Sequence, residues 1–74
     1  MRITVKLFAT LRTGRFASEV VDLDGPQTIA EVIDRIGIPQ KEVTLIFVNG
    51  RHASRDVRLS EVDILALFPP VGGG

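Results

Sequence analysis

Hydrophobic and polar residues alternate most regularly from Arg2 to Phe8. Ile3, Val5 and Leu7 fall on one side of this stretch, and polar residues separate them. Because successive side chains of a strand point to opposite faces, the pattern predicts a half-buried strand. Phe8 is then expected to emerge at the strand end, beside the face opposite to the apolar side.

Turn signals and β-branched residues mark the remaining strands. A glycine-containing turn at 10–15 joins the first strand to a second one. Asn49-Gly50 is a strong hairpin signal, and it separates a third strand from a short edge strand. Strands are therefore expected at residues 2–8, 16–23, 43–48, 51–54 and 64–68.

In the middle of the chain the spacing of hydrophobic residues changes from every second residue to every third or fourth residue, which predicts one helix. Thr28 stands where a helix cap belongs, and Glu31, three residues on, completes a capping box. Gly37 ends the helix, and Pro39 forbids its continuation. An apolar stripe at i, i+3, i+4 and i+7 gives the helix one face to bury, formed by Ile29, Val32, Ile33 and Ile36.

The elements together predict an α+β domain with the order β-β-α-β-β-β over residues 1–68, followed by a flexible tail at 69–74. The single helix must cover one face of a mixed sheet, since neither layer can bury its apolar side alone. The other sheet face is expected to stay open.

Strand parity predicts which side chains lie on the open face. In the last strand, alternation places Leu65 and Leu67 in the core and turns Phe68 outward. In the third strand it assigns Val43, Leu45 and Phe47 to the core and turns Ile46 outward. The outward residues Phe8, Ile46 and Phe68 are expected to form an apolar patch at the root of the tail. The patch is either a partner site or the closed end of a small core.

Composition excludes several classes of function. Nine basic and nine acidic residues cancel, with no basic cluster, so nucleic acid and anionic membrane partners are not expected. No apolar run approaches the ~20 residues that span a bilayer, and a cytoplasmic location is expected. The chain has no cysteine, and its one histidine, His52, cannot hold a metal alone. Nothing indicates intrinsic catalysis or a bound cofactor.

The chain ends in a stiff apolar stem and a glycine tip, Phe68-Pro69-Pro70-Val71-Gly72-Gly73-Gly74. Proline fixes φ and lacks an N–H, so the two prolines stop the last strand and project the tail away from the sheet. Glycine removes side-chain bulk, so the tip can thread a narrow channel. The plain alternative is a frayed terminus or a remnant of cloning.

Both ends of the chain resemble the β-grasp, ubiquitin-like sulfur carriers. Residues 7–12, Leu-Phe-Ala-Thr-Leu-Arg, resemble the start of the small subunit of molybdopterin synthase, and 66–71 followed by Gly73-Gly74 resemble its end. The related thiamin-pathway carriers share the fold and the terminal Gly-Gly, but they usually lack the Phe-Pro-Pro stem. Gly72 replaces a small substituted residue of the family, and Val62 replaces a glycine in an acidic-Gly-Asp turn.

The resemblance implies that a ubiquitin-activating-type enzyme uses ATP and magnesium to adenylate Gly74. A persulfide donor then converts the acyl-adenylate to a thiocarboxylate. The tail, Pro69 to Gly74, is implied to enter the large subunit of molybdopterin synthase or, in the thiamin pathway, the thiazole synthase. A Cβ at Gly73 or Gly74 would compete with the walls of the enzyme channels. Arg12 matches a contact with the activating enzyme, or it is a solvated turn residue.

Two further functions stay open. The chain is alternatively a ubiquitin-like modifier joined through Gly74 to lysines of other proteins, which covalent adducts would reveal. It is otherwise a plain interaction module with an idle tail, in which case truncation of Gly73-Gly74 would be silent.

Overall fold

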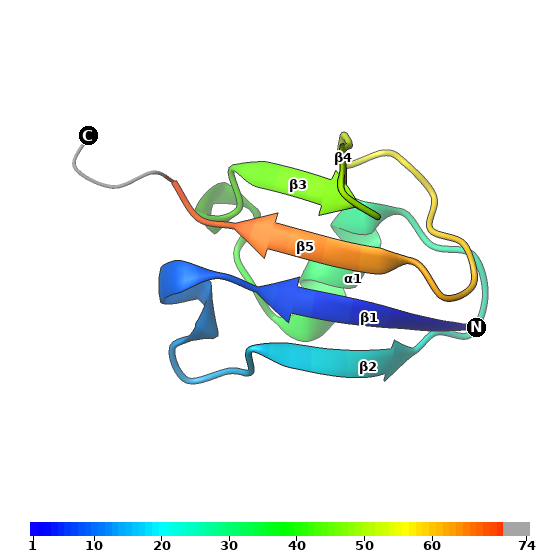
Figure 1. The fold of residues 1–74 in the computed structure, drawn as a ribbon, viewed down its shortest axis with the longest axis horizontal. Helices are drawn as coiled ribbons and strands as arrows, with labels where there is room; N and C mark the ends of the chain where they lie inside the picture. The colour runs from blue at the N-terminus through cyan, green and yellow to red at the C-terminus, as the bar shows by residue number, and fades with distance from the viewer. Residues whose placement is uncertain (71–74) are drawn as a thin grey trace.

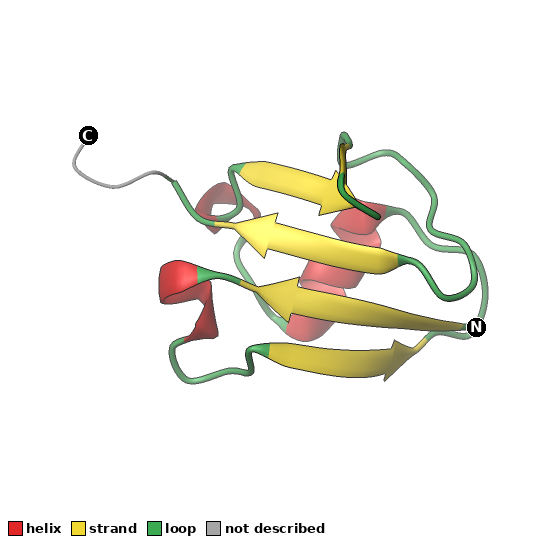
Figure 2. Ribbon diagram, viewed as in Figure 1, coloured by secondary structure: helices red, strands yellow, loops and turns green. Residues whose placement is uncertain are grey.

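The computed structural model describes residues 1–70 of the chain. A five-stranded sheet carries one α-helix on one face, with no second layer of described residues on the other (Figures 1 and 2). In chain order the elements are β1 (Arg2–Leu7), η1 (Ala9–Arg12), β2 (Ser18–Asp22), α1 (Ile29–Ile36), η2 (Gln40–Glu42), β3 (Leu45–Val48), β4 (Arg51–His52) and β5 (Ile64–Phe68), where η marks a 3-10 helix. This order confirms the predicted α+β class and the β-β-α-β-β-β sequence of elements.

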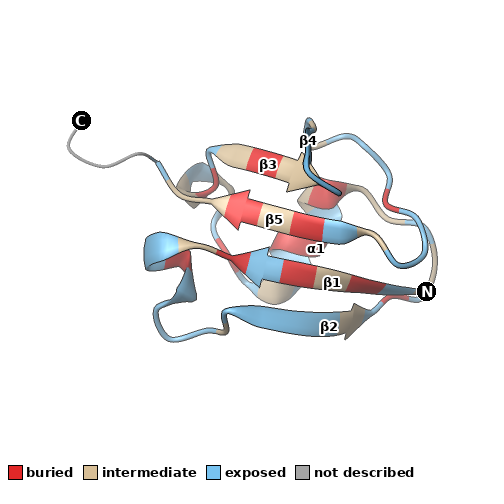
Figure 3. Ribbon diagram, viewed as in Figure 1, coloured by how far each residue is buried: buried red, intermediate tan, exposed pale blue. Residues whose placement is uncertain are grey.

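The sheet order is β2-β1-β5-β3-β4, so β5 lies in the centre. The pairing of β1 with β5 is parallel, and the other neighbouring pairs are antiparallel. Buried residues alternate with more exposed ones along β1 and β5 (Figure 3). The alternation predicted for both strands is therefore confirmed. The buried core consists of Ile3, Val5, Leu7, Leu11, Leu23, Ile29, Val32, Ile33, Ile38, Val43, Ile46, Leu59, Leu65 and Leu67.

Helix α1 begins and ends at the predicted signals. The Thr28 hydroxyl accepts from the Glu31 N–H at 3.2 Å, and the Glu31 carboxylate accepts from the Thr28 N–H at 2.8 Å. The hydrogen bond from the Thr28 backbone holds the pKa of Glu31 below its ordinary value. Gly37 closes the helix with a left-handed φ of 85°.

The connection between β1 and β2 differs from the predicted turn. Residues 9–12 form η1, which buries Leu11, and β2 begins only at Ser18. Val20 pairs with Thr4 across the two strands, and cross-strand partners share a face. Val20 therefore lies on the open face, where it is 61% exposed.

The expectation that Ile46 faces outward is wrong. Its partner on β5 is Leu67, a core residue, and Ile46 is only 3% exposed. Val43 is also buried, although alternation would put these two residues on opposite faces. The reason is that regular strand begins at Leu45, after η2, so parity counted from Val43 does not carry into β3.

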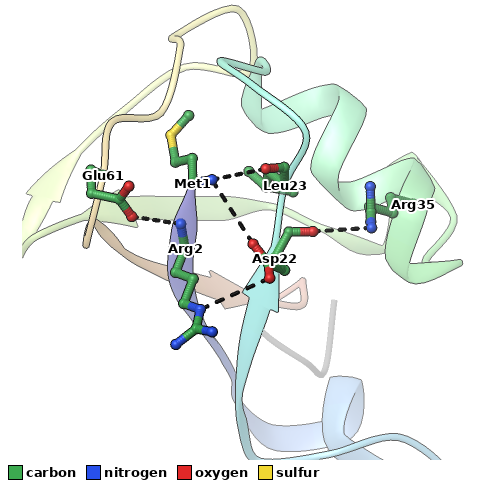
Figure 4. A network of polar contacts seen from close by, with 6 residues as sticks. All are labelled: Met1, Arg2, Asp22, Leu23, Arg35 and Glu61. Atoms are coloured by element: carbon green, nitrogen blue, oxygen red, sulfur yellow. Dashed lines mark hydrogen bonds and ion pairs between the residues drawn. The ribbon is translucent and has the colours of Figure 1, made fainter.

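A polar network ties the start of β1 to its neighbours (Figure 4). The Arg2 N–H donates to the Glu61 carboxylate at 2.6 Å, which connects β1 with the loop before β5. Arg35 of α1 donates to the carbonyl of Asp22 at 3.1 Å, while the Asp22 carboxylate lies 3.9 Å from both the Met1 amino group and Arg2 Nε. Such exposed ion pairs contribute little stability, so the network mainly orients the strand ends.

Val62 occupies a strained backbone conformation in the loop before β5. Its φ is 60°, in the left-handed region, and its N–H donates to the carbonyl of Arg2 at 2.8 Å. A branched side chain is disfavoured there, and Val62 is 77% exposed, so no burial offsets the strain. This geometry explains physically why glycine suits the position.

We expect Val62→Gly to stabilise the protein by about 1 kcal/mol, because relief of left-handed strain exceeds the added entropy of the unfolded chain. Urea denaturation measures the change. Val57→Gly is the reference variant, because φ at Val57 is not positive: it relieves no strain and loses both backbone entropy and the partial burial of a side chain that is 39% exposed. Equal losses in both variants would show that Val62 carries no strain.

Arg55 joins the loop after β4 to η2. Its guanidinium donates to the Gln40 side-chain oxygen at 3.1 Å, to the Gln40 carbonyl at 2.8 Å and to the carbonyl of Val43. Gln40 in turn donates to the carbonyl of Ala30 at 2.9 Å, so the contact extends to α1. No local sequence pattern indicates this bridge, because its partners lie 12 and 15 residues away.

Replacing Arg55 with alanine is expected to lower the free energy of unfolding by about 1–3 kcal/mol, since two main-chain carbonyls lose a charged donor. Thermal and urea denaturation test this expectation. The control is Arg51→Ala, because the Arg51 side chain makes no hydrogen bond within residues 1–70 and should tolerate removal. A similar loss in both variants would contradict the bridging role.

Candidate functional site

Three phenylalanines gather on the open face where β5 ends. The rings of Phe8 and Phe68 stack with their centroids 4.3 Å apart and their planes 8° from parallel. Phe47 meets Phe68 edge-on, at 5.7 Å and 82°. All three residues are half-buried, so their rings support one another and still reach the surface. We call Phe8, Phe47 and Phe68 the aromatic cluster.

Strand register brings the aromatic cluster together. Phe68 pairs with Leu45 and Phe47 with Ala66, which places both phenylalanines on the face opposite to the core. The Phe8 N–H donates to the carbonyl of Leu67 at 3.2 Å and so continues the pairing of β1 with β5. Three segments that are distant in sequence thus meet only because β5 inserts between β1 and β3.

Two of the three residues predicted for the apolar patch lie together in the structure, and a different residue occupies the place predicted for the third. Phe8 and Phe68 lie together as expected, whereas Ile46 points into the core and Phe47 takes its place. Parity counted from Val43 predicts that Phe47 lies in the core, and the structure shows the opposite. The pairing of β3 with β5 is the signal that predicts the correct faces. Leu67 is buried, and its cross-strand partner Ile46 must lie on the same face, which turns Phe47 outward.

Two cationic side chains and one histidine border the aromatic cluster. The Arg12 guanidinium lies 5.7 Å from the centre of the Phe8 ring, and its Nε donates to the carbonyl of Leu7 at 2.9 Å. His52 meets Phe47 edge-on at 5.8 Å. Lys6 is exposed and pairs with Ala66, in the row beside the cluster. Arg12 is exposed, and its contacts with the Phe8 ring and the Leu7 carbonyl hold its side chain beside the cluster.

The tail leaves the domain at this cluster. Strand β5 pairs with β1 on one side and with β3 on the other, so pairing on both sides fixes the position of the strand that ends at Phe68. Pro69 is half-buried and Pro70 is exposed. The other predicted tail residues, Val71, Gly72, Gly73 and Gly74, lie outside the described residues.

The described residues contain neither a candidate metal site nor a membrane-spanning helix. Within residues 1–70, no three histidine, cysteine or acidic side chains are grouped so that they could hold a metal ion. The same part of the chain contains no helix with the length and apolarity needed to cross a membrane. What the site does provide is an apolar, positively bordered surface beside the exit of the tail.

A mixed sheet with one helix on one face and a tail leaving its central strand defines a ubiquitin-like β-grasp domain. The chain belongs to the ThiS family of ubiquitin-like sulfur carriers, whose family model matches residues 5–74. No curated protein matches the sequence significantly.

Solved structures agree with this placement. SAMP1 from Haloferax volcanii is 29% identical, with a TM-score of 0.78 and full coverage of both chains. A putative molybdopterin converting factor, subunit 1, from Pyrococcus furiosus is 28% identical, with a TM-score of 0.76 over 96% of this chain and 99% of that one. One chain in a structure of the complex of subunits 1 and 2 of molybdopterin-converting factor from Helicobacter pylori matches at 21% identity and a TM-score of 0.67, over the full length of both chains compared, which shows the shared fold.

Proposed function

We propose that this protein is a cytoplasmic sulfur carrier for molybdopterin synthesis, with the sulfur held as a thiocarboxylate on Gly74. The observation that carries the proposal is the aromatic cluster, which the central strand β5 places beside the exit of the tail. An enzyme that docks on the cluster receives the tail at a defined position. Membership of the ThiS family supports the same chemistry.

The reaction requires help from other proteins. An α-carboxylate is ionised at neutral pH and is a poor electrophile. In the proposed sequence, a ubiquitin-activating-type enzyme uses Mg-ATP to convert the Gly74 carboxylate to an acyl-adenylate, and pyrophosphate leaves. The terminal sulfur of a persulfide then attacks the carbonyl carbon and expels AMP, and a thiol reduces the sulfur–sulfur bond to leave the thiocarboxylate. The carrier is a protein substrate in each step.

The proposed acceptor is the large subunit of molybdopterin synthase, which transfers the sulfur to a pterin precursor. The Phe68-Pro69-Pro70 stem and the similarity to the Pyrococcus furiosus protein favour this acceptor. The Helicobacter pylori structure that contains a chain of this fold is a protein–protein complex of subunits 1 and 2. Copurification with a large synthase subunit would support the assignment, whereas copurification with a thiazole synthase would favour the thiamin pathway.

A protein modifier is the second candidate function. The similarity to SAMP1 extends over the whole length of both chains, and one structure of the Haloferax protein is described as small archaeal modifier protein 1. In this alternative the activated Gly74 forms an amide bond with a lysine amino group of another protein. Adenylation is shared by both functions, and only the nucleophile differs.

Intact mass spectrometry separates these functions. The full chain is incubated with the host's activating enzyme, Mg-ATP and a persulfide donor, and a chain without Gly73-Gly74 serves as the control. Exchange of one carboxyl oxygen for sulfur in the full chain alone is the expected result. Adducts on other proteins without this exchange would favour the modifier. If neither the exchange nor the adducts were detected, the protein would be a β-grasp binding module with an idle tail.

A further inference from the structure

A hollow of about 830 Å³ lies beside the β3–β4 hairpin, and of its lining residues His52 also contacts Phe47 of the aromatic cluster. The lining residues of the hollow come from the hairpin, from the loop that follows β4 and from Asp63, just before β5. Figure 1 shows the course of the hairpin and of this loop. Val48, at the end of β3, pairs with Leu65 near the start of β5, so the hollow lies toward the opposite end of β5 from Phe68. It is therefore separate from the exit of the tail.

Two arginines without close partners line this hollow. Five of the seven arginines, namely Arg2, Arg12, Arg15, Arg35 and Arg55, use their side chains to pair with Asp22 or to donate to carbonyl oxygens. Within residues 1–70, Arg51 makes no such contact, and Arg58 makes only one at 3.5 Å, to the carbonyl of Pro26. Both Arg51 and Arg58 line the hollow, together with His52.

The single carboxylate of the hollow does not neutralise these groups. One oxygen of Asp63 accepts from the Asn49 side chain at 2.8 Å, and the other accepts from the Ser60 N–H at 2.7 Å. Asp63 forms no ion pair with a described residue within 4.0 Å. The hydrogen bonds with Thr28 are the main cause of the lowered pKa of Glu31, and the charge of Arg58 adds a smaller effect in the same direction. Two guanidinium groups against one occupied carboxylate leave the hollow positively charged.

We propose that this hollow binds an extended acidic segment of a partner protein. Guanidinium groups bind carboxylates through paired hydrogen bonds, so Arg51 and Arg58 supply the charge recognition. Val48, Ala53 and Val57 form an apolar part of the wall, which suits aliphatic side chains between acidic ones. A lone inorganic anion would leave this apolar wall uncovered.

The edge of the sheet supplies a backbone contact for the same segment. β4 is an edge strand, so its outer side has no strand paired with it among the described residues. An edge strand presents free N–H and C=O groups to which an extended peptide can add. Alternating side chains of the added segment would then place every second residue toward the arginines. The inference is independent of the sulfur-carrier proposal, because it uses neither the tail nor the aromatic cluster.

Titration of the ¹⁵N-labelled full chain with a capped peptide of alternating Asp and Val tests the proposal. We expect amide shifts concentrated at residues 48–58, and affinity lowered about tenfold in Arg51→Gln and in Arg58→Gln. Lys41→Gln is the control, since it removes the same charge from η2 outside the hollow. Amide spectra of the variants verify that each remains folded.

Two further probes complete the test. A peptide with Asn in place of Asp should bind at least tenfold more weakly, and inorganic phosphate should compete poorly. Shifts centred on the aromatic cluster, affinity unchanged by both arginine substitutions, or absence of binding would each overturn the proposal. Equal binding of phosphate and peptide would also overturn it, because it would indicate a small-anion site.

Discussion

Replacing Gly73 with valine or Gly74 with alanine is expected to abolish thiocarboxylate formation without unfolding the domain. Both positions lie beyond β5, so the sheet and core do not depend on them. A new Cβ would restrict the backbone and add bulk where, in the proposed function, the tail enters an enzyme channel. We expect a loss of at least 100-fold in the rate of sulfur incorporation, measured by intact mass spectrometry, which corresponds to about 2.7 kcal/mol in the barrier.

Gly72→Ala is the matched control for the tail. The carriers that this chain resembles commonly have a small substituted residue at this position, so an added methyl group should be tolerated. Wild-type rates in Gly72→Ala with loss in Gly73→Val would locate the narrow part of the channel at the last two residues. Full activity of Gly73→Val and Gly74→Ala would refute threading of the tail.

Phe47→Ala is expected to weaken binding of the activating enzyme and of the acceptor at least tenfold while the domain remains folded. The ring of Phe47 packs against Phe68 and stands on the open face, so its loss removes contact area at the root of the tail. Aromatic residues near the centre of an interface contribute about 2 kcal/mol or more when they are hot spots. Calorimetric titration with each purified partner measures the effect.

Ile46→Ala is the contrasting variant on the same strand. Its side chain lies in the core at 3% exposure, so truncation should lower the free energy of unfolding by about 2–5 kcal/mol. The folded fraction of Ile46→Ala should bind partners with unchanged affinity, because the open face is intact. If Ile46→Ala weakened binding and Phe47→Ala did not, the assignment of the aromatic cluster as the docking surface would fail.

Local sequence patterns determined the elements whose signals act over a few residues. The capping box of Thr28 and Glu31 and the left-handed Gly37 predicted both ends of α1, because these contacts span only three or four positions. Asn49 and Gly50 both have positive φ, as the predicted hairpin requires. The alternation along β1 and β5 identified their core faces directly.

Tertiary pairing decided the features that carry the proposed binding functions. The insertion of β5 between β1 and β3 unites Phe8, Phe47 and Phe68, and the break of alternation after η2 sends Ile46 inward. The bridge from Arg55 and the hollow lined by Arg51 and Arg58 likewise depend on how the loop after β4 folds back. These contacts join residues that are distant in sequence, so they form only when the burial of the whole core selects one strand order and one register. The chain by itself therefore specifies the elements and the glycine tail, and the assembled sheet specifies the surfaces that partners meet.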